Sequence, residues 1–214
     1  MTTRYSSPQA EAQYSWLSGI LDTFYISDTQ VEAHLQKTAK KGIVPSCHRG
    51  CHACCLKPTV PITEPELMVI SWYVSEVLLG EIRAQVKIRL IEHRSRLECP
   101  FLVERSCSIY PIRPLICRQF LVKSKPCEVG EDVLETRPQD VMSLPRETVI
   151  RPVAMRLLDY YQLKSSTAKR KAFESGFIGK SAREMHLYDW TQIATTMDHF
   201  DNMVQFIIPS GTER

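Results

Sequence analysis

Cysteine is the residue type in this sequence that could do chemistry. Four cysteines fall within nine residues, in the string CHRGCHACC, and four more follow over the next part of the chain. The full set is Cys47, Cys51, Cys54, Cys55, Cys99, Cys107, Cys117 and Cys127. Thiolates crowded in this way are typical ligands of zinc or of an iron–sulfur cluster. The sequence therefore predicts a metal centre with all eight cysteines as candidate ligands.

A disulfide framework and a set of inert, buried cysteines are the two alternatives. Neighbouring Cα atoms are about 3.8 Å apart, below the roughly 4.4 Å minimum of an ordinary disulfide, so Cys54 and Cys55 do not pair. The chain begins without a secretory signal, and its longest apolar stretch, residues 67–79, is too short and too polar to cross a membrane. We therefore expect a cytoplasmic protein whose thiols stay reduced or bind metal. Cysteine is often buried as a small apolar residue, but such clustering argues against simple packing.

The first four cysteines are expected on one face of a short helix. A helix that begins after Pro45, with Ser46 as N-cap, turns by about 100° per residue and places all four thiols within an arc of about 100°. In its first turn the helix dipole would lower the pKa of Cys47 and favour the thiolate. Cys54 and Cys55 would diverge by about 100°, so that only one of them serves a given ion.

The later cysteines lie in a proline-rich stretch with few helix signals. A metal that joined Cys99, Cys107 and Cys117 to the first four would order this segment, since structural zinc contributes on the order of 10–16 kcal/mol of binding free energy. Cys127 lies in a polar loop, where ligation and an inert role are equally open. His48 and His52 could bind zinc or contact a sulfur, but their polar surroundings favour exposure to solvent.

The rest of the chain predicts a mainly α fold with low strand content, in a single domain over residues 1–214. Apolar residues at helical spacing cover residues 11–40, where Asp28 is expected to cap a second helix, and residues 147–206. Between these helical regions, residues 44–130 form the cysteine segment, which is expected to be irregular after Cys99.

Two helices are predicted inside the cysteine segment. Thr63 and Glu66 have the spacing of a capping box, which begins a helix that ends near Gly80. A second helix over residues 81–96 is expected to bury Ile82, Val86 and Leu90.

The motif strings resemble the YkgJ-like cysteine-cluster family. They are a Cys-Cys pair preceded by cysteines three and seven residues before it, then CPFL, then C-S-I-Y-x-x-R-P-x-x-C-R-x-F, within residues 47–127. The resemblance implies zinc or iron chelation by these thiols, with Cys47 as a position that varies. Arg113 and Arg118 belong to the last string and are expected to bind the cofactor, by neutralising thiolates or donating hydrogen bonds to sulfur. The alternative is that they are surface or helix-capping arginines.

Three functions compete on this basis. The first is a metal-binding protein with an iron–sulfur cluster, a [4Fe–4S] cluster in particular, used in electron transfer or sensing, because the candidate ligands are all sulfur. The second is a structural zinc module, supported by the division of eight thiols into two sets of four. The third is a thiol enzyme that uses Cys54 or Cys55, for which His52 is a poorly placed base.

The only partner that the sequence predicts is a metal ion or cluster, and the composition argues against two other classes of partner. The net charge of +3 is small and its basic residues are dispersed, so no nucleic acid is expected. The chain has 8 glycines and no glycine-rich phosphate loop, which argues against nucleotide cofactors. The sequence specifies neither a protein partner nor a reaction.

Overall fold

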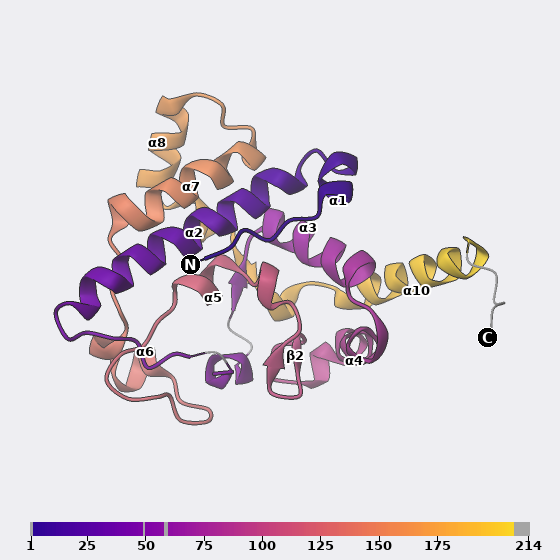
Figure 1. Ribbon diagram of the computed structural model, residues 1–214, viewed down its shortest axis with the longest axis horizontal. Coiled ribbons are helices and arrows are strands. Elements are labelled where there is room, and N and C mark those ends of the chain that lie inside the picture. Colours follow the sequence, from indigo (N-terminus) through magenta and orange to yellow (C-terminus); the bar gives the residue numbers. More distant parts are fainter. Residues whose placement is uncertain (1, 49, 58–59, 208–214) are drawn as a thin grey trace.

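Helices make up most of the chain, which confirms the predicted mainly α fold (Figure 1). The computed structural model describes residues 2–48, 50–57 and 60–207, with side chains up to residue 199. The α-helices are α1 (Pro8–Gln13), α2 (Leu17–Ala39), α3 (Glu64–Trp72), α4 (Gly80–Ile91), α5 (Leu115–Gln119), α6 (Val133–Thr136), α7 (Arg151–Leu157), α8 (Ser166–Glu174), α9 (Phe177–Ser181) and α10 (Trp190–Ile207). Short 3-10 or π turns are η1 (Ala53–Leu56), η2 (Tyr73–Val77), η3 (His93–Ser95), η4 (Tyr110–Ile112), η5 (Pro138–Asp140), η6 (Arg146–Ile150), η7 (Leu158–Tyr161) and η8 (Met185–Leu187). No helix in the described part is long and apolar enough to cross a membrane.

Strands are few, as the sequence predicts. β1 (Pro61–Ile62) pairs with β4 (Arg183–Glu184), and β2 (Leu102–Val103) pairs with β3 (Ser106–Cys107), both antiparallel. We call Cys47 to Cys55 the first cysteine group and Cys99 to Cys127 the later cysteine group. The first strand pair joins the end of the first cysteine group to the C-terminal part of the chain. The second pair is a hairpin inside the later cysteine group.

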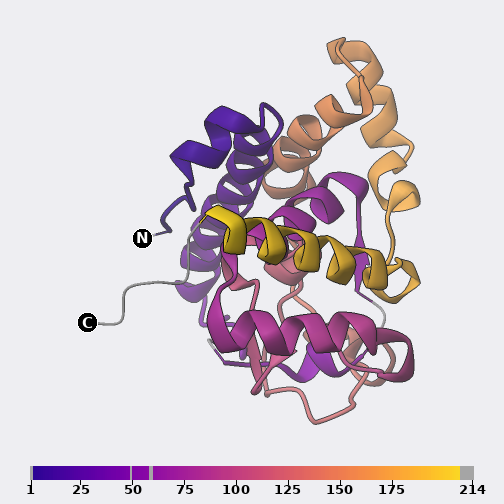
Figure 2. The same ribbon diagram turned by 90° about the vertical axis from the view of Figure 1, so that its right-hand side faces the viewer.

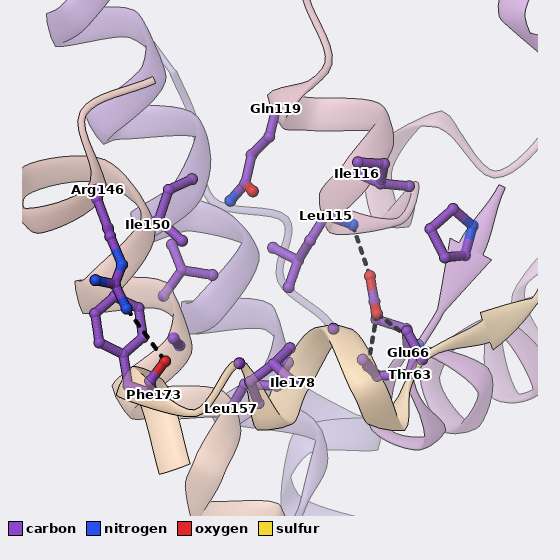
Figure 3. Close-up of a pocket in the computed structure, with 16 residues that line it drawn as sticks. Thr63, Glu66, Leu115, Ile116, Gln119, Arg146, Ile150, Leu157, Phe173 and Ile178 are labelled. Atoms are coloured by element: carbon purple, nitrogen blue, oxygen red, sulfur yellow. Dashed lines mark hydrogen bonds between the residues drawn. The ribbon is translucent and has the colours of Figure 1, made fainter. Parts of the chain in front are cut away.

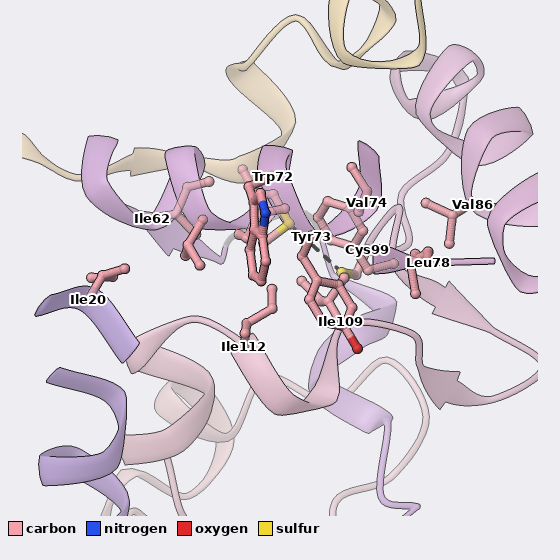
Figure 4. Packing of buried hydrophobic residues seen from close by; sticks show 14 of the residues in the cluster. Ile20, Ile62, Trp72, Tyr73, Val74, Leu78, Val86, Cys99, Ile109 and Ile112 are labelled. Atoms are coloured by element: carbon pink, nitrogen blue, oxygen red, sulfur yellow. Dashed lines mark hydrogen bonds between the residues drawn. The ribbon is translucent and has the colours of Figure 1, made fainter. Parts of the chain in front are cut away.

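One large cluster of buried side chains is built around α2 and α3. Helix α2 packs on α7, α5 and α3, while α10 packs on α4 and η2. Members of the cluster reach from Leu17 in α2 to Met197 in α10 and include Ile70, Phe101 and Trp190. Figure 4 shows Cys99 in this cluster beside Tyr73, Val74 and Leu78, so one of the candidate ligands is also part of the core.

The predicted division of the N-terminal helix at Asp28 is wrong. Helix α2 continues from Leu17 to Ala39, and the break falls earlier, between α1 and α2. Asp28 does not cap a helix because its carboxylate pairs with Arg118 and Arg113 of the later cysteine group. The residue thus ties α2 to the cysteine segment.

The capping box of α3 is confirmed, and the buried face of α4 is confirmed in part. Thr63 and Glu66 make both hydrogen bonds of the box. Val86 and Leu90 are buried as predicted, whereas Ile82 is 39% exposed. Its neighbour Arg83 is buried instead, because its guanidinium donates hydrogen bonds to backbone carbonyls of η2 and α10.

The two cysteine groups gather at one end of the molecule. In Figure 1 the chain around η1, the β2–β3 hairpin and α6 lies below α2 and α3, and the view in Figure 2 keeps these segments together below the same helices. Helices α7 and α8 lie on the opposite side of α2 in Figure 1. Segments far apart in the sequence therefore meet where the sequence predicts a metal centre.

The ion pairs of Arg4, which lies in the segment before α1, are expected to weaken in acid. The guanidinium of Arg4 lies 2.7 Å from the Glu11 carboxylate and 2.6 Å from that of Asp22, and its hydrogen bond lowers the pKa of Glu11 from 4.5 to about 2. The carboxyl group of Glu11 binds a proton more weakly in the folded chain than in the unfolded chain. The stabilisation by the Arg4–Glu11 pair is therefore present above pH 4.5 and is lost as the pH falls through about 2. Glu11→Gln should therefore be less stable than the wild type at pH 6 and approach it near pH 2, as measured by urea unfolding. A stability difference that stays constant over this range would contradict the assignment.

Candidate metal centre

The first cysteine group is mostly irregular, so the predicted helix over Cys47 to Cys55 is wrong. Only η1, from Ala53 to Leu56, is helical, and Gly50 adopts a φ of 89°, a left-handed conformation that interrupts a right-handed helix. Cys47 therefore gains nothing from a helix dipole. Burial raises its pKa instead, and the neighbouring thiols of Cys51 and Cys127 raise it further.

Three hydrogen bonds donated by backbone amides hold the first group against the later one. The amide of Ser46 donates to the carbonyl of Val122 over 2.7 Å, and the amide of Val122 donates to the sulfur of Cys47 over 3.4 Å. The amide of Cys99 donates to the carbonyl of Cys55 over 2.7 Å. Both ends of the first group are thereby fixed to segments that carry or flank later cysteines.

The later group contains more local structure than the sequence predicts. Glu104 and Arg105 both have positive φ, which gives β2 and β3 a tight two-residue turn, and Cys107 ends this hairpin opposite Leu102. The sequence lacks the Asn-Gly or Asp-Gly pair that usually marks such a turn. Cys117 lies on the five-residue helix α5.

Thiols from both groups line one cavity of about 300 Å³. They are Cys54 from the first group and Cys117 and Cys127 from the later group. The remaining wall consists of Lys57, Val60, Pro61, Ile116, Phe120, Glu131, Asp132, Val133 and Leu134. Lys57 and Asp132 form an ion pair of 3.0 Å there, so the charged groups of the wall are partly neutralised by one another.

The thiols influence one another as near neighbours. Burial raises the pKa of Cys117 well above its ordinary value, and the thiols of Cys99, Cys54 and Cys107 raise it further. Burial also raises the pKa of Cys99 to about 12, again with contributions from Cys107 and Cys54. Like charges in a buried space disfavour ionisation, and a bound cation would reverse this effect.

Cys54 and Cys55 do not diverge as the helical prediction required. The thiol of Cys55 donates a hydrogen bond to the sulfur of Cys54, which lowers the pKa of Cys54 to about 7 and raises that of Cys55. The hydrogen bond therefore favours the thiolate at Cys54 over the thiolate at Cys55. Cys54 is exposed at the surface while Cys55 is half-buried.

The thiols gather without forming a finished coordination site. Among the residues that the structure describes, no three Cys, His, Asp or Glu side chains are placed to hold one metal ion. Several thiols have hydrogen-bond partners within the protein instead. Cys55 donates a hydrogen bond to Cys54, and the amide of Val122 donates one to the sulfur of Cys47. The donor set nevertheless fits a thiophilic metal, because soft sulfur atoms from two segments line the same cavity.

Arg113 and Arg118 make their hydrogen bonds away from the sulfur atoms. Arg118 is buried, pairs with Asp28, donates to the carbonyls of Pro111 and Arg113 over 2.8 Å each, and stacks on a phenylalanine of α2. Arg113 lies 3.4 Å from Asp28 and stacks on Tyr110. Burial raises the pKa of Cys107, and the positive charges of both guanidinium groups lower it in part. The two arginines therefore act on this thiol through their charge.

The two nearby histidines contribute little to the cavity. His48 is exposed, and Nδ1 of the partly exposed His52 lies 3.2 Å from the carbonyl of Gly50. Neither belongs to the cavity wall that carries Cys54, Cys117 and Cys127.

Sequence reasoning missed two residues next to the cysteines. Met185 places its sulfur 3.8 Å from that of Cys99, inside the core, and nothing in the spacing links residues 86 positions apart. Glu66 was expected only to cap α3, but its carboxylate also accepts a 2.7 Å hydrogen bond from the amide of Leu115, the first residue of α5. It therefore positions the helix that carries Cys117.

Thiols brought together from two irregular segments of a helical chain define a cysteine-rich, metal-chelating type of domain. Residues 46–140 match the CxxCxxCC family, described as a "putative zinc- or iron-chelating domain". The matched segment is less than half of the chain, and the match confirms the resemblance seen in the motif strings. No curated protein and no solved structure matches the chain.

Proposed function

We propose that the chain binds a [4Fe–4S] cluster in the thiol-lined cavity and uses it for electron transfer or sensing. The observation that carries this proposal is the cavity of about 300 Å³ lined by Cys54, Cys117 and Cys127. A cysteine side chain turns about a single χ1 bond, and binding of one cluster requires changes of rotamer to bring the thiols to a common centre. Iron–sulfur clusters take thiolate ligands, which is the donor type this cavity offers.

The size of the cavity favours a cluster over a single zinc ion. Zinc lies about 2.3 Å from each of its sulfur ligands, so a closed zinc site needs no cavity. A polynuclear cluster needs a space between its ligands. The spacing Cys-x2-Cys that is typical of zinc knuckles occurs only at Cys51 and Cys54.

The position of the cavity suits electron transfer or sensing. Cys54 is exposed, so a cluster bound there would lie close to the surface, where a redox partner can approach it. Solvent exposure and nearby charge are also the properties that set a cluster's reduction potential. Arg113 and Arg118 would raise this potential through their positive charge.

A pair of four-thiolate zinc sites is the second candidate. The thiols of Cys51 and Cys127 raise the pKa of Cys47, and the thiols of Cys99 and Cys117 raise the pKa of Cys55. The thiol of Cys54 contributes to both shifts. With Cys107 added to the second of these sets, the eight thiols could form two groups of four. Such sites would hold the proline-rich segment in place without any redox role.

Metal analysis of anaerobically purified protein tests the proposal. We expect a brown protein with visible thiolate-to-iron absorption and about four iron and four sulfide per chain, since this is the composition of the cluster. A colourless protein with about two zinc per chain would favour the second candidate. A protein without iron or zinc would contradict both.

A pair of serine variants separates one centre from two. Cys117 lines the cavity, whereas Cys47 does not and bonds to the amide of Val122. For a single cluster, Cys117→Ser should lose nearly all iron and Cys47→Ser should keep it. For two zinc sites, each variant should lose about half of the metal. Retention of full metal content in Cys117→Ser would contradict the cavity as the site.

A further inference from the structure

A second cavity, of about 370 Å³, lies between α5, α7 and α9 (Figure 3). Most of its wall comes from residues 146–182, outside the segment that matches the cysteine family. The two cavities share only Pro61 and Ile116 in their walls. The second cavity is therefore a separate space, and nothing in its wall is a candidate metal ligand of cysteine type.

The wall of this cavity is largely apolar. Its aliphatic side chains include Leu115, Ile150, Val153, Leu157 and Ile178. The volume lies within the range of about 300–1,000 Å³ that is usual for small-molecule sites, which combine an apolar wall with a few placed polar groups.

Two of the three long polar side chains in the wall have strong partners of their own. Both oxygens of the Glu66 carboxylate accept hydrogen bonds, one from Leu115 at 2.7 Å and the other from the amide of Thr63 at 2.8 Å. The amide of Gln119 donates to the hydroxyl of Ser27 over 3.2 Å. These groups are engaged in the fold.

Arg146, an exposed residue, differs from them because no carboxylate in the described part of the chain pairs with its charge. Among the described residues it forms no ion pair, and its one hydrogen bond, to the carbonyl of Phe173, is long at 3.4 Å. Its guanidinium stacks on the Phe173 ring, 4.5 Å from the ring centre, which holds it at the edge of the cavity. A guanidinium has five N–H donors in a planar fork that matches a carboxylate, so most of its donors are open to a ligand.

We propose that this cavity binds an apolar monocarboxylate, with the tail among the aliphatic side chains and the carboxylate on Arg146. Figure 3 shows Arg146 and Glu66 on opposite sides of the cavity. The negative charge of Glu66 would repel a second carboxylate at the far end of the ligand, so a dicarboxylate of the same length should bind more weakly. The proposal uses no metal and is independent of the proposed cluster.

Calorimetric titration of the full chain with octanoate tests this site. Octanoate should bind, while octanol and the dicarboxylate suberate should bind at least about 10-fold more weakly, because a charge-assisted pair with arginine is lost or a repulsion is added. Failure of octanoate to bind, or equal binding of octanoate and octanol, would overturn the proposal.

Two glutamine variants locate the carboxylate. Arg146→Gln should weaken octanoate binding about 10-fold or more and leave octanol unchanged. Arg151→Gln is the matched control, because the Arg151 side chain is 42% exposed, lies one helical turn further on and already pairs with Glu147 at 2.6 Å. An equal effect of both substitutions, or no effect of Arg146→Gln, would contradict the assignment.

Discussion

Alanine in place of Glu66 is expected to lower the free energy of unfolding by about 3 kcal/mol. The side chain is 2% exposed and accepts hydrogen bonds from the amide and hydroxyl of Thr63 and from the amide of Leu115. Removal of the carboxylate leaves these donors buried without an acceptor. Burial also raises the pKa of Glu66, so part of the loss is offset by relief from a desolvated charge. Urea unfolding of the variant and the wild type measures the difference.

The same substitution should loosen the helix that carries Cys117. The bond to Leu115 fixes the start of α5, and without it the mostly buried thiol two residues further on should react faster with a thiol reagent. Glu66→Gln keeps one carbonyl oxygen and should fall between the wild type and the alanine variant. Glu64→Ala, at an exposed position of the same turn, is the control and should change stability by less than about 0.5 kcal/mol. A Glu66→Ala variant as stable as this control would refute the role of the carboxylate.

Local signals predicted those parts of the fold that depend on neighbouring residues. The capping box at Thr63 and Glu66 needs only residues three apart, and the structure contains it. The buried positions Val86 and Leu90 follow from helical spacing in the same way. The motif strings also pointed to a cysteine domain, because they carry the family's own spacing.

Contacts between distant segments overrode the local signals elsewhere. Helical geometry placed four thiols on one face, but Gly50 takes a left-handed conformation and the group is held by Val122 and Cys99. The turn at Glu104 and Arg105 carries no glycine or asparagine, so its two positive φ angles could not be anticipated. Approach of Met185 to Cys99 likewise depends on how the C-terminal segment packs, which no spacing encodes.

Alanine in place of Asp28 is expected to cost about 3 kcal/mol of stability, the low end for breaking a buried ion pair, since the Asp28 side chain is 22% exposed. Its partner Arg118 is almost fully buried, and burial lowers the pKa of that guanidinium to about 10. Burial of the Arg118 cation costs desolvation free energy, which the negative charge of Asp28 offsets. Without Asp28 the cation would stay buried without a neighbouring negative charge. Asp22→Ala is the matched control on the same helix. Asp22 is 39% exposed and pairs with Arg4, so its loss should cost less than about 1 kcal/mol.

The Asp28 substitution should also make the segment beside the cysteines more mobile. Arg118 follows Cys117 directly and donates to the carbonyls of Pro111 and Arg113, so its release would free the turn between Cys107 and Cys117. Hydrogen exchange of amides in residues 107–118 should therefore be faster in Asp28→Ala than in Asp22→Ala. Equal exchange in both variants would mean that the turn is held by its own packing. The ion pair would then contribute to stability without positioning the thiols.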